Sequence, residues 1–337
     1  MPAGDMADCP KSMTYGPCGG VRDDLRCEMA EHVCTFADLD EPRPWSAEPA
    51  AGTPTSALLT ALATGRALLS DLTLPSYDAK ALASLVAVMS DSCDAFLVGE
   101  HQNRPDFPPT VIAALVREAG GVPWMTLACR DRNRVVLEQE VAGLGLVGAD
   151  GVLCVTGDGR APGVRPGVTQ VFDLDGTELA ALAAQRGLAV AVPESPEAAP
   201  QHLRPGRLVQ KQRAGAHLAV LNHVGRAERL AVFVAEARAQ GLTIPVVAGV
   251  AVYTDEPSAR VLQRFPGLHV DGASVERVLA ADDVREAGIA AAVDEALALL
   301  AIDGISGVNL SGRGSSMSEA DGAEVKAEVG HRIRAAA

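Results

Sequence analysis

Four cysteines near the start of the chain have the residue type and the clustering that a metal site needs. Eight, eight and six residues separate Cys9, Cys18, Cys27 and Cys34, in a segment rich in glycine and turn residues. Thiolates are soft ligands that select zinc or an iron–sulfur cluster, and a reducing compartment disfavours disulfides. We predict that these cysteines bind a metal, with His32 as a candidate substitute ligand. Free thiols in a flexible tail are the alternative, and the spacing does not distinguish zinc from an iron–sulfur cluster.

Polar side chains also follow a series of apolar runs further along the chain, and several are suited to acid–base chemistry. A carboxylic acid with a raised pKa can protonate a weakly basic nitrogen, and a carboxylate can accept two parallel N–H bonds. Any one of these residues can instead cap a helix, as Asn133 would. The candidates are Asp71, Glu100, Arg130, Asn133, Thr156, Asp158, Glu194 and Asn222.

If the apolar runs are strands of one sheet, the polar residues that follow them lie close together. The runs cover residues 67–73, 94–98, 123–128, 151–155, 188–192, 217–221, 245–249 and 305–310. The amphipathic stretches between them predict helices over 78–90, 108–119, 133–147, 175–185, 225–240, 255–265 and 281–301. Eight such units predict a (β/α)8 TIM barrel, whose chemistry lies at the carboxyl ends of the strands. A doubly wound open sheet is the competing architecture, because periodicity does not show closure.

The composition changes between the cysteine-bearing segment and the repeating units. Residues 41–56 are rich in proline, alanine and serine and have no hydrophobic period, which is typical of a linker. We therefore predict a cysteine-rich metal-binding module over residues 1–40, a linker over 41–56 and the barrel over 57–337.

Composition and charge exclude several classes of protein. The 337 residues are 48% hydrophobic and 21% charged, as in an ordinary globular chain. The formal net charge of −14 would repel a nucleic-acid backbone or an anionic membrane surface. The start of the chain lacks a basic and apolar leader, and Asp294, Glu295 and Asp303 interrupt its most apolar C-terminal stretch. We expect a cytoplasmic protein with no nucleic-acid or membrane partner.

Several motifs resemble those of methylenetetrahydrofolate reductases, in the branch that carries a short cysteine-bearing module. That module usually follows the barrel, and here the matching segment precedes it. The matching residues are Cys9-Pro-Lys-Ser-Met-Thr-Tyr-Gly-Pro-Cys18-Gly-Gly with Cys27 and Cys34, then Thr126-Leu-Ala-Cys129-Arg-Asp-Arg-Asn133, Val155-Thr-Gly-Asp158, Lys211 ahead of Ala214-Gly-Ala216, and Gly307-Val-Asn-Leu-Ser-Gly312. Their order and spacing also agree, so the resemblance covers both parts of the chain.

The resemblance implies a flavin-using barrel enzyme of one-carbon metabolism. Such an enzyme takes hydride from NADH or NADPH through FAD and reduces 5,10-methylenetetrahydrofolate to 5-methyltetrahydrofolate. The implied partners are therefore small molecules, a folate and a nicotinamide. A homo-oligomer or a partner redox protein remains open.

The resemblance also assigns roles to individual residues. Asp158 matches the aspartate that binds the pterin and tunes the flavin, and Lys211 matches the lysine that holds the flavin phosphates. Asp71 lies nearest the glutamate that protonates the folate, and Glu100 is a rival proton donor. The remaining assignments are Thr156 and Phe172 to the cofactor, and Asn222, Arg130 and Asn133 to the folate.

Two departures from the family pattern keep other functions open. The first strand reads Ser70-Asp71-Leu-Thr-Leu-Pro75, with a shorter acid than the family's glutamate, and Val192 stands where the family often has a tyrosine near the flavin. The reductase is therefore either flavin-dependent or flavin-independent. A folate-dependent methyl or methylene transferase, or a demethylation partner, would use the same folate contacts without hydride transfer. An electron-transfer subunit would use the cysteine module as its redox centre.

Overall fold

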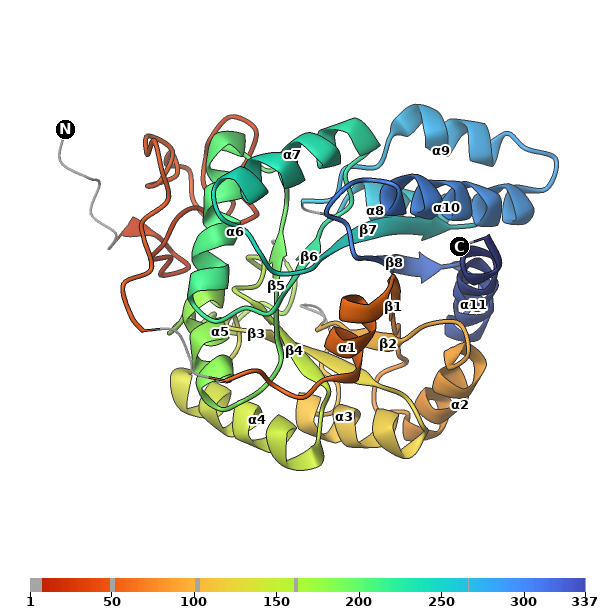
Figure 1. The fold of residues 1–337 in the computed structure, drawn as a ribbon, viewed down its shortest axis with the longest axis horizontal. Helices are drawn as coiled ribbons and strands as arrows, with labels where there is room; N and C mark the ends of the chain where they lie inside the picture. The colour runs from red at the N-terminus through yellow and green to blue at the C-terminus, as the bar shows by residue number, and fades with distance from the viewer. Residues whose placement is uncertain (1–7, 49–51, 101–103, 161–162, 266, 337) are drawn as a thin grey trace.

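A computed structural model gives the structure of the chain over residues 8–48, 52–100, 104–160, 163–265 and 267–336. Parallel strands in sequence order close into one barrel, in which β1 pairs with β8 (Figure 1). The predicted (β/α)8 barrel is confirmed, and the open doubly wound sheet is wrong because the first and last strands pair with each other. The strands are β1 (Ala67–Asp71), β2 (Ala95–Val98), β3 (Pro123–Ala128), β4 (Gly151–Val155), β5 (Val190–Glu194), β6 (Leu218–Leu221), β7 (Val246–Tyr253) and β8 (Gly307–Gly314).

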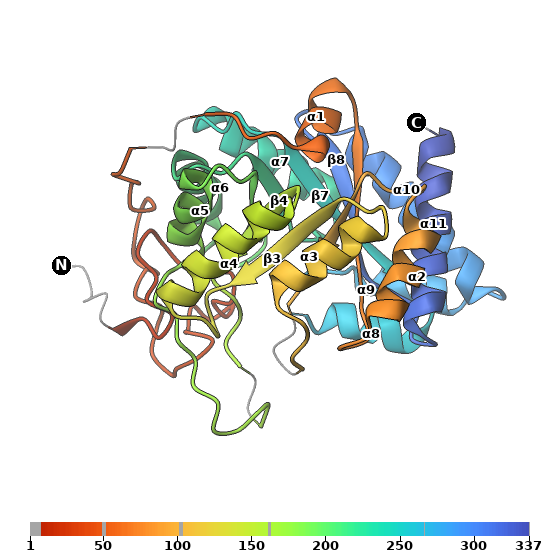
Figure 2. The same ribbon diagram turned by 90° about the horizontal axis from the view of Figure 1, so that it is seen from below.

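Helices surround the barrel on its outside (Figures 1 and 2). Local sequence fixes several of their ends: a capping box of Asp175 and Glu178 starts α5, and left-handed Gly148 ends α4. The helices are α1 (Ala57–Thr64), α2 (Ala79–Met89), α3 (Pro109–Glu118), α4 (Arg134–Val147), α5 (Gly176–Gln185), α6 (Arg204–Arg213), α7 (Ala227–Ala239), α8 (Glu256–Gln263), α9 (Gly272–Leu279), α10 (Val284–Leu300) and α11 (Glu319–Ala336). The sequence analysis did not predict α1, α6, α9 or α11.

Helix α6 was not predicted because its sequence lacks the usual apolar pattern. Its buried face carries Arg204, Arg207 and Lys211, so the helix lacks the apolar stripe that marks a helix packed on a core. The charged side chains are instead buried against Glu194 at the end of β5. The helix therefore belongs to the polar site described below.

Helix α1 closes the amino-terminal end of the barrel. Its Leu58 and Leu62 join the apolar side chains that fill the barrel interior, including Trp124. Asp150 anchors the start of the helix, because its carboxylate accepts hydrogen bonds from Ser56 Oγ at 2.8 Å and from the Ala57 amide at 2.7 Å. In Figure 1, α1 lies across this opening. The open end of the barrel is thus the carboxyl end of its strands.

The N-terminal segment, residues 8–48, packs against the barrel beside α5 and α6 (Figures 1 and 2). It contains no α-helix in its described residues, and one isolated bridge joins Arg26 to Val33. The part predicted as a linker also makes contacts, since the Trp45 amide donates to Gln210 Oε1 at 2.8 Å. The three-part division of the chain stays a prediction.

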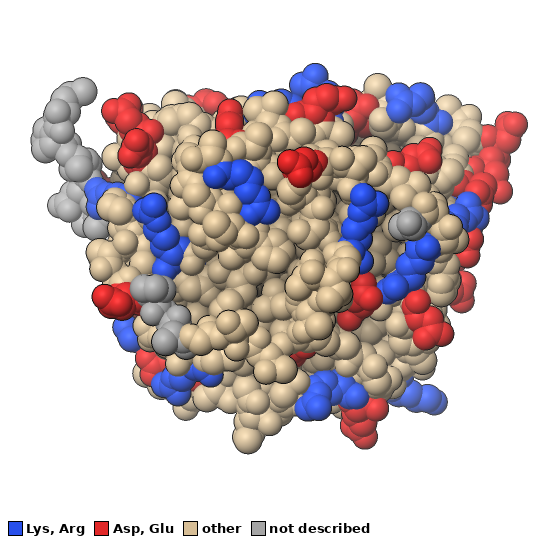
Figure 3. Space-filling view, in the orientation of Figure 1, with Lys and Arg blue, Asp and Glu red and all other residues tan. Residues whose placement is uncertain are grey.

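Across the described residues, no helix combines the length and the apolar character that a membrane crossing requires. On the face in Figure 3, acidic and basic side chains are interspersed and form no large area of one sign.

Candidate functional site

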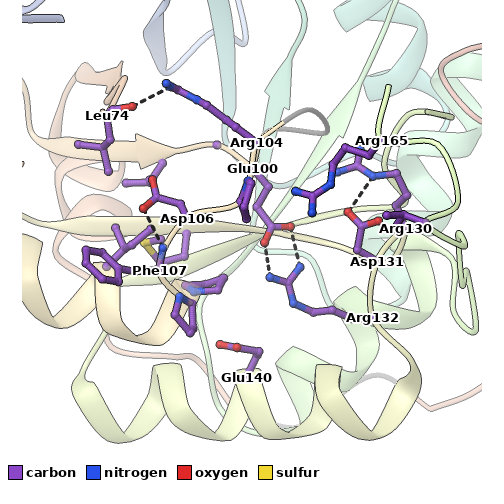
Figure 4. Close-up of a pocket in the computed structure, with 18 of the residues that line it drawn as sticks. Leu74, Glu100, Arg104, Asp106, Phe107, Arg130, Asp131, Arg132, Glu140 and Arg165 are labelled. Atoms are coloured by element: carbon purple, nitrogen blue, oxygen red, sulfur yellow. Dashed lines mark hydrogen bonds and ion pairs between the residues drawn. The ribbon is translucent and has the colours of Figure 1, made fainter. Parts of the chain in front are cut away.

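Two contiguous cavities lie at the carboxyl ends of the strands. Gly99, Glu100 and Arg130 line both of them. The inner cavity, of about 280 Å³, is lined by Thr126, Thr156, Asp158, Glu194, Asn222 and Lys211 of the barrel and by Lys11, Cys18 and Gly19 of the N-terminal segment. The arginine cavity, of about 480 Å³, is lined by Arg104, Arg130, Arg132, Arg160 and Arg165 (Figure 4).

Glu100 lies where the two cavities meet. Its carboxylate forms a two-pronged ion pair with Arg132, with N–O distances of 2.9 and 2.5 Å, and accepts a hydrogen bond from the Ala128 amide at 2.8 Å. Burial raises the pKa of Glu100, and this effect outweighs the lowering by Arg132. Glu100 therefore combines a fixed orientation with an increased tendency to hold a proton.

Asp158 lies on the loop after β4 and lines the inner cavity. Within the described ranges, no side chain or amide donates a hydrogen bond to its carboxylate; only its backbone carbonyl is engaged, by Arg130 Nη1 at 3.4 Å. Gly157 and Gly159 flank it, and Gly157 has a φ of +92°. This half-buried carboxylate is thus available to accept N–H bonds from a ligand.

Two further residues assigned from the sequence lie in the inner cavity and already have partners. Asn222 Nδ2 donates to Ser195 Oγ at 2.6 Å, which leaves its amide oxygen available to a ligand. Thr156 Oγ1 accepts from the Gly176 amide at 2.8 Å, where it ties the loop to the start of α5. Thr156 therefore shapes the cavity wall, and Asn222 presents an acceptor to the cavity.

A buried cluster of charges forms one wall of the inner cavity. Glu194 pairs with Lys211 at 2.8 Å and with Arg204 at 3.4 Å. Burial alone would raise the pKa of Glu194, but its basic neighbours together lower it. Arg207, which is only 3% exposed, lies 4.0 Å from Glu194, and its Nε and Nη1 have no hydrogen-bond partner in the described chain. The wall therefore has an excess of positive charge.

Two of the residues that the resemblance assigns to the cofactor, Lys211 and Phe172, already have contacts within the protein. The Lys211 ammonium is bound by Glu194 Oε2 and by the Pro193 carbonyl, and burial lowers its pKa to about 8. Phe172 is 1% exposed and packs in the hydrophobic core, outside both cavities. Phe172 therefore lies apart from the cavities, whereas Lys211 lines the inner cavity with its ammonium already paired, and both flavin roles stay predictions.

Two other residues singled out from the sequence lie away from both cavities. Asn133 lines neither cavity and caps α4, because its side-chain oxygen accepts a hydrogen bond from the Val136 amide at 3.0 Å. This is the helix-capping role that the sequence left as the alternative. Asp71 accepts hydrogen bonds from Asn309 at 2.9 Å and from the Gly312 amide at 3.3 Å. Of the two candidate proton donors, only Glu100 lines the cavities.

The arginine cavity combines basic groups with acidic partners. Five arginines and four acids line it, the acids being Glu100, Asp106, Asp131 and Glu140. Arg130 and Arg160 both pair with Asp131. Figure 4 shows Arg132 bound to Glu100 and Arg165 extending across the same cavity. The cavity thus has a small positive excess.

The four N-terminal cysteines line one small cavity together with Glu28 and His32. Their gathering, from positions far apart in the segment, fits the donor set that a soft metal would require. Within the described chain, however, no three His, Cys, Asp or Glu side chains are already arranged around a metal position. Cys9, Cys18, Cys27 and Cys34 therefore remain a predicted ligand set, with zinc and an iron–sulfur cluster both open.

Replacing Cys18 by alanine is expected to release the metal from the purified protein and to destabilise the N-terminal segment, because a four-thiolate site would lose one ligand. Elemental analysis for zinc and iron checks this. The variant Cys93→Ala, at a buried thiol of the barrel, is the control and should keep the wild-type metal content. Unchanged metal content in Cys18→Ala would remove Cys18 from the ligand set.

The structure adds residues that the sequence analysis did not single out. Lys11, Arg207 and Ser195 line the inner cavity, and Glu28 binds Lys11. The only sequence signal for Arg207 is its spacing with Arg204 and Lys211, which places all three on one face of a helix. A charged helical face is ordinarily solvated, so this signal gives no indication of burial.

Comparison with known proteins supports the fold of this chain and does not show its function. No known protein family and no curated protein matches the sequence. Among solved structures, a Clostridium thermocellum protein that binds two copies of 5-methyl-5,6,7,8-tetrahydrofolic acid matches with a TM-score of 0.63 and 12% identity, over 84% of this chain and 100% of that one. Tryptophan synthase from M. tuberculosis has a TM-score of 0.47 and 13% identity, over 83% of this chain and 99% of that one. Oxaloacetate acetylhydrolase has a TM-score of 0.47 and 13% identity, over 77% and 81%. The similarity to the Clostridium thermocellum protein is a similarity of fold.

Proposed function

We propose that this protein binds a reduced folate at the carboxyl end of its barrel and acts on the one-carbon unit that the folate carries. The observation that carries the proposal is the unpaired Asp158 carboxylate in the inner cavity, beside the acceptor oxygen of Asn222. The pterin ring presents neighbouring N–H donors, which a single carboxylate can accept in parallel. The similarly folded Clostridium thermocellum protein, which binds 5-methyltetrahydrofolic acid, supports the same class of ligand.

The arginine cavity suits the other end of a folate. Folates end in a glutamyl group with two carboxylates, and arginine binds carboxylates through paired N–H groups. The side chain of Arg165 has no ion-pair or hydrogen-bond partner in the part of the chain that the structure describes, so its guanidinium is available. A ligand with its pterin in the inner cavity and its tail toward Arg165 would occupy both contiguous spaces.

The reaction we propose is reduction of 5,10-methylenetetrahydrofolate to 5-methyltetrahydrofolate. The folate's N10 takes a proton as its bond to the methylene carbon breaks. The resulting iminium carbon accepts hydride from NADH or NADPH, which leaves as the oxidised nicotinamide. Glu100 is the proton donor of this proposal, because it lines both cavities and its pKa is raised. The proposed step includes no flavin, since the Lys211 ammonium already pairs with Glu194 and Phe172 is buried in the hydrophobic core.

A methyl or methylene transfer is the second candidate. The solved structure of similar fold binds the methylated folate, which is the donor in a transfer reaction. Oxidation of NADH or NADPH that depends on 5,10-methylenetetrahydrofolate supports the reductase. Tight folate binding with no nicotinamide oxidation would favour the transferase.

Replacing Asp158 by asparagine is expected to weaken binding of 5-methyltetrahydrofolate about 10- to 150-fold, which corresponds to the ~1.5–3 kcal/mol of a hydrogen bond to a charged group. The physical reason is that an amide presents one acceptor and a competing donor to the pterin N–H groups. Isothermal titration calorimetry under anaerobic conditions measures the affinity.

The matched control is Asp173→Asn, at an exposed carboxylate of the same connection that accepts from the Arg134 amide. It should bind like the wild type. Wild-type affinity in Asp158→Asn would contradict the assignment of Asp158 to the pterin, and a wild-type protein that binds no reduced folate would contradict the proposed function.

A further inference from the structure

The loop that carries Asp158 is held from outside the barrel. Lys11 Nζ donates to the carbonyl oxygen of Gly157 at 2.8 Å, and the Gly159 amide donates to Glu28 Oε1 at 2.9 Å. Lys11 and Glu28 also form an ion pair with each other. Two residues of the N-terminal segment therefore bind the backbone on both sides of Asp158.

The loop needs such a restraint because its own sequence gives it little. Glycines flank Asp158, and glycine backbones lose more conformational freedom on ordering than any other residue. Roughly 20 residues separate the end of β4 at Val155 from the start of α5 at Gly176, and those of them that the structure describes form neither helix nor strand. Without external contacts, the carboxylate would sample many positions relative to the inner cavity.

The contacts are at least partly shielded from water, which increases their effect. Lys11 is 3% exposed, and the side chain of Glu28 is 14% exposed. A methyl group built on Gly159 would lie 2.6 Å from Met29 Cγ, so the segment packs directly on this loop. Hydrogen bonds to charged groups are stronger than neutral ones, more so where water is excluded.

The N-terminal segment is itself fixed to the rigid part of the barrel. The Thr14 amide donates to Asp175 at the start of α5, at 3.1 Å. Arg204 of α6 donates to the Cys18 carbonyl at 2.9 Å. These contacts hold the segment in place relative to α5 and α6. Lys11 and Glu28 therefore hold the loop in a defined position relative to the same helices.

We propose that Lys11 and Glu28 are positioning residues, which hold the Asp158 carboxylate in place for the N–H groups of its ligand. The ligand half of this proposal rests on the proposed function. Lys11 lies two residues after Cys9, and Glu28 directly follows Cys27. The positions of Lys11 and Glu28 therefore depend on how the four cysteines are arranged around their small cavity. The N-terminal segment therefore belongs to the ligand site, because it positions the Asp158 carboxylate.

The test uses the full chain with the variants Lys11→Met and Glu28→Ala. Hydrogen–deuterium exchange of the peptide containing Gly159 should become about 10-fold faster in both variants, because each removes one of the two hydrogen bonds from the N-terminal segment to this loop. Binding of 5-methyltetrahydrofolate should weaken about 5- to 30-fold. Adding Lys11→Met to Asp158→Asn should produce little further loss of affinity, since positioning has no value once the positioned group is gone.

Arg26→Met is the matched control, because Arg26 lies in the same segment and pairs only with the exposed side chains of Asp24 and Glu31 in the described chain. Its exchange and its affinity should equal those of the wild type. Glu28→Ala keeps the test valid if Lys11→Met does not fold.

Each outcome decides a separate point. Unchanged exchange at Gly159 in both variants would overturn the proposal. Faster exchange with unchanged folate affinity would overturn the positioning role. A wild-type protein that binds no folate would contradict the proposed function alone, while the exchange measurement would still decide whether the two residues hold the loop.

Discussion

Replacing Glu100 by glutamine is expected to lower turnover of 5,10-methylenetetrahydrofolate about 100- to 10,000-fold, the range for loss of a general acid. Glutamine keeps the size of the side chain and an oxygen for the Ala128 amide, but it cannot deliver a proton to the folate nitrogen. Affinity for 5-methyltetrahydrofolate should change much less than turnover, because the proton is needed in the reaction and not in product binding. Steady-state oxidation of NADH or NADPH, paired with calorimetry, separates the two quantities.

The pH dependence of turnover gives a second check on Glu100. Burial raises its pKa, and only the protonated form can act as the acid. Turnover should therefore fall as the pH rises through this raised pKa, and Glu100→Gln should lose that limb of the profile. The control is Glu140→Gln, at a carboxylate that lines the arginine cavity and binds Thr110 at 2.7 Å. Full turnover in Glu100→Gln would eliminate Glu100 as the donor.

Replacing Glu194 by glutamine is expected to lower the free energy of unfolding by about 3–5 kcal/mol, the usual loss when one partner of a buried charge cluster is removed. Lys211, Arg204 and Arg207 would then remain buried without the carboxylate that all three face. Urea denaturation followed by circular dichroism measures the change. A loss below about 1 kcal/mol would show that water or other groups compensate these cations.

The matched control for Glu194 is Glu197→Gln. Glu197 lies three residues further on and pairs with Arg229 at 3.1 Å, at a partly exposed position. Surface pairs of this kind contribute about 0–1 kcal/mol, so this variant should be nearly as stable as the wild type. Because the pKa of Glu194 is lowered in the fold, its contribution should be complete above the unfolded-state pKa of about 4.3 and disappear as the pH falls through the lower folded-state value.

The sequence determined the architecture because the barrel repeats one simple pattern. Strands such as β2, β3 and β6 are short apolar runs buried on both faces, and the predicted helices follow the apolar periodicity of a helix packed on a core. Closure could not be read from this pattern, since an open sheet has the same periodicity. It became visible only in the pairing of Leu69 with Asn309 across β1 and β8.

The sequence also indicated which side chains could act, by placing them after the strands. Parallel strands end at the same edge of a barrel, so Glu100, Asp158, Glu194 and Asn222 line one cavity as that rule requires. The four cysteines likewise gather around one small space, although their roles as ligands stay predictions.

Only the tertiary structure decided which of these side chains face a ligand. Asp71 and Glu100 are equivalent acids at the ends of neighbouring strands, yet Asn309 and the Gly312 amide bind Asp71 away from the cavities. The Lys211 ammonium, chemically suited to phosphate, is bound by Glu194. A side chain's partners are often distant in sequence, and no local pattern specifies them.

The place of the N-terminal segment was also decided by tertiary contacts alone. A linker rich in proline and alanine gives no indication of where the segment it joins will dock. In the fold, Lys11 reaches Gly157 across 146 positions of the chain, and Glu28 reaches Gly159 across 131. Sequence fixes local conformation and the kind of chemistry available, whereas the geometry of a site depends on long-range packing and charge pairing, which exist only once the chain has folded.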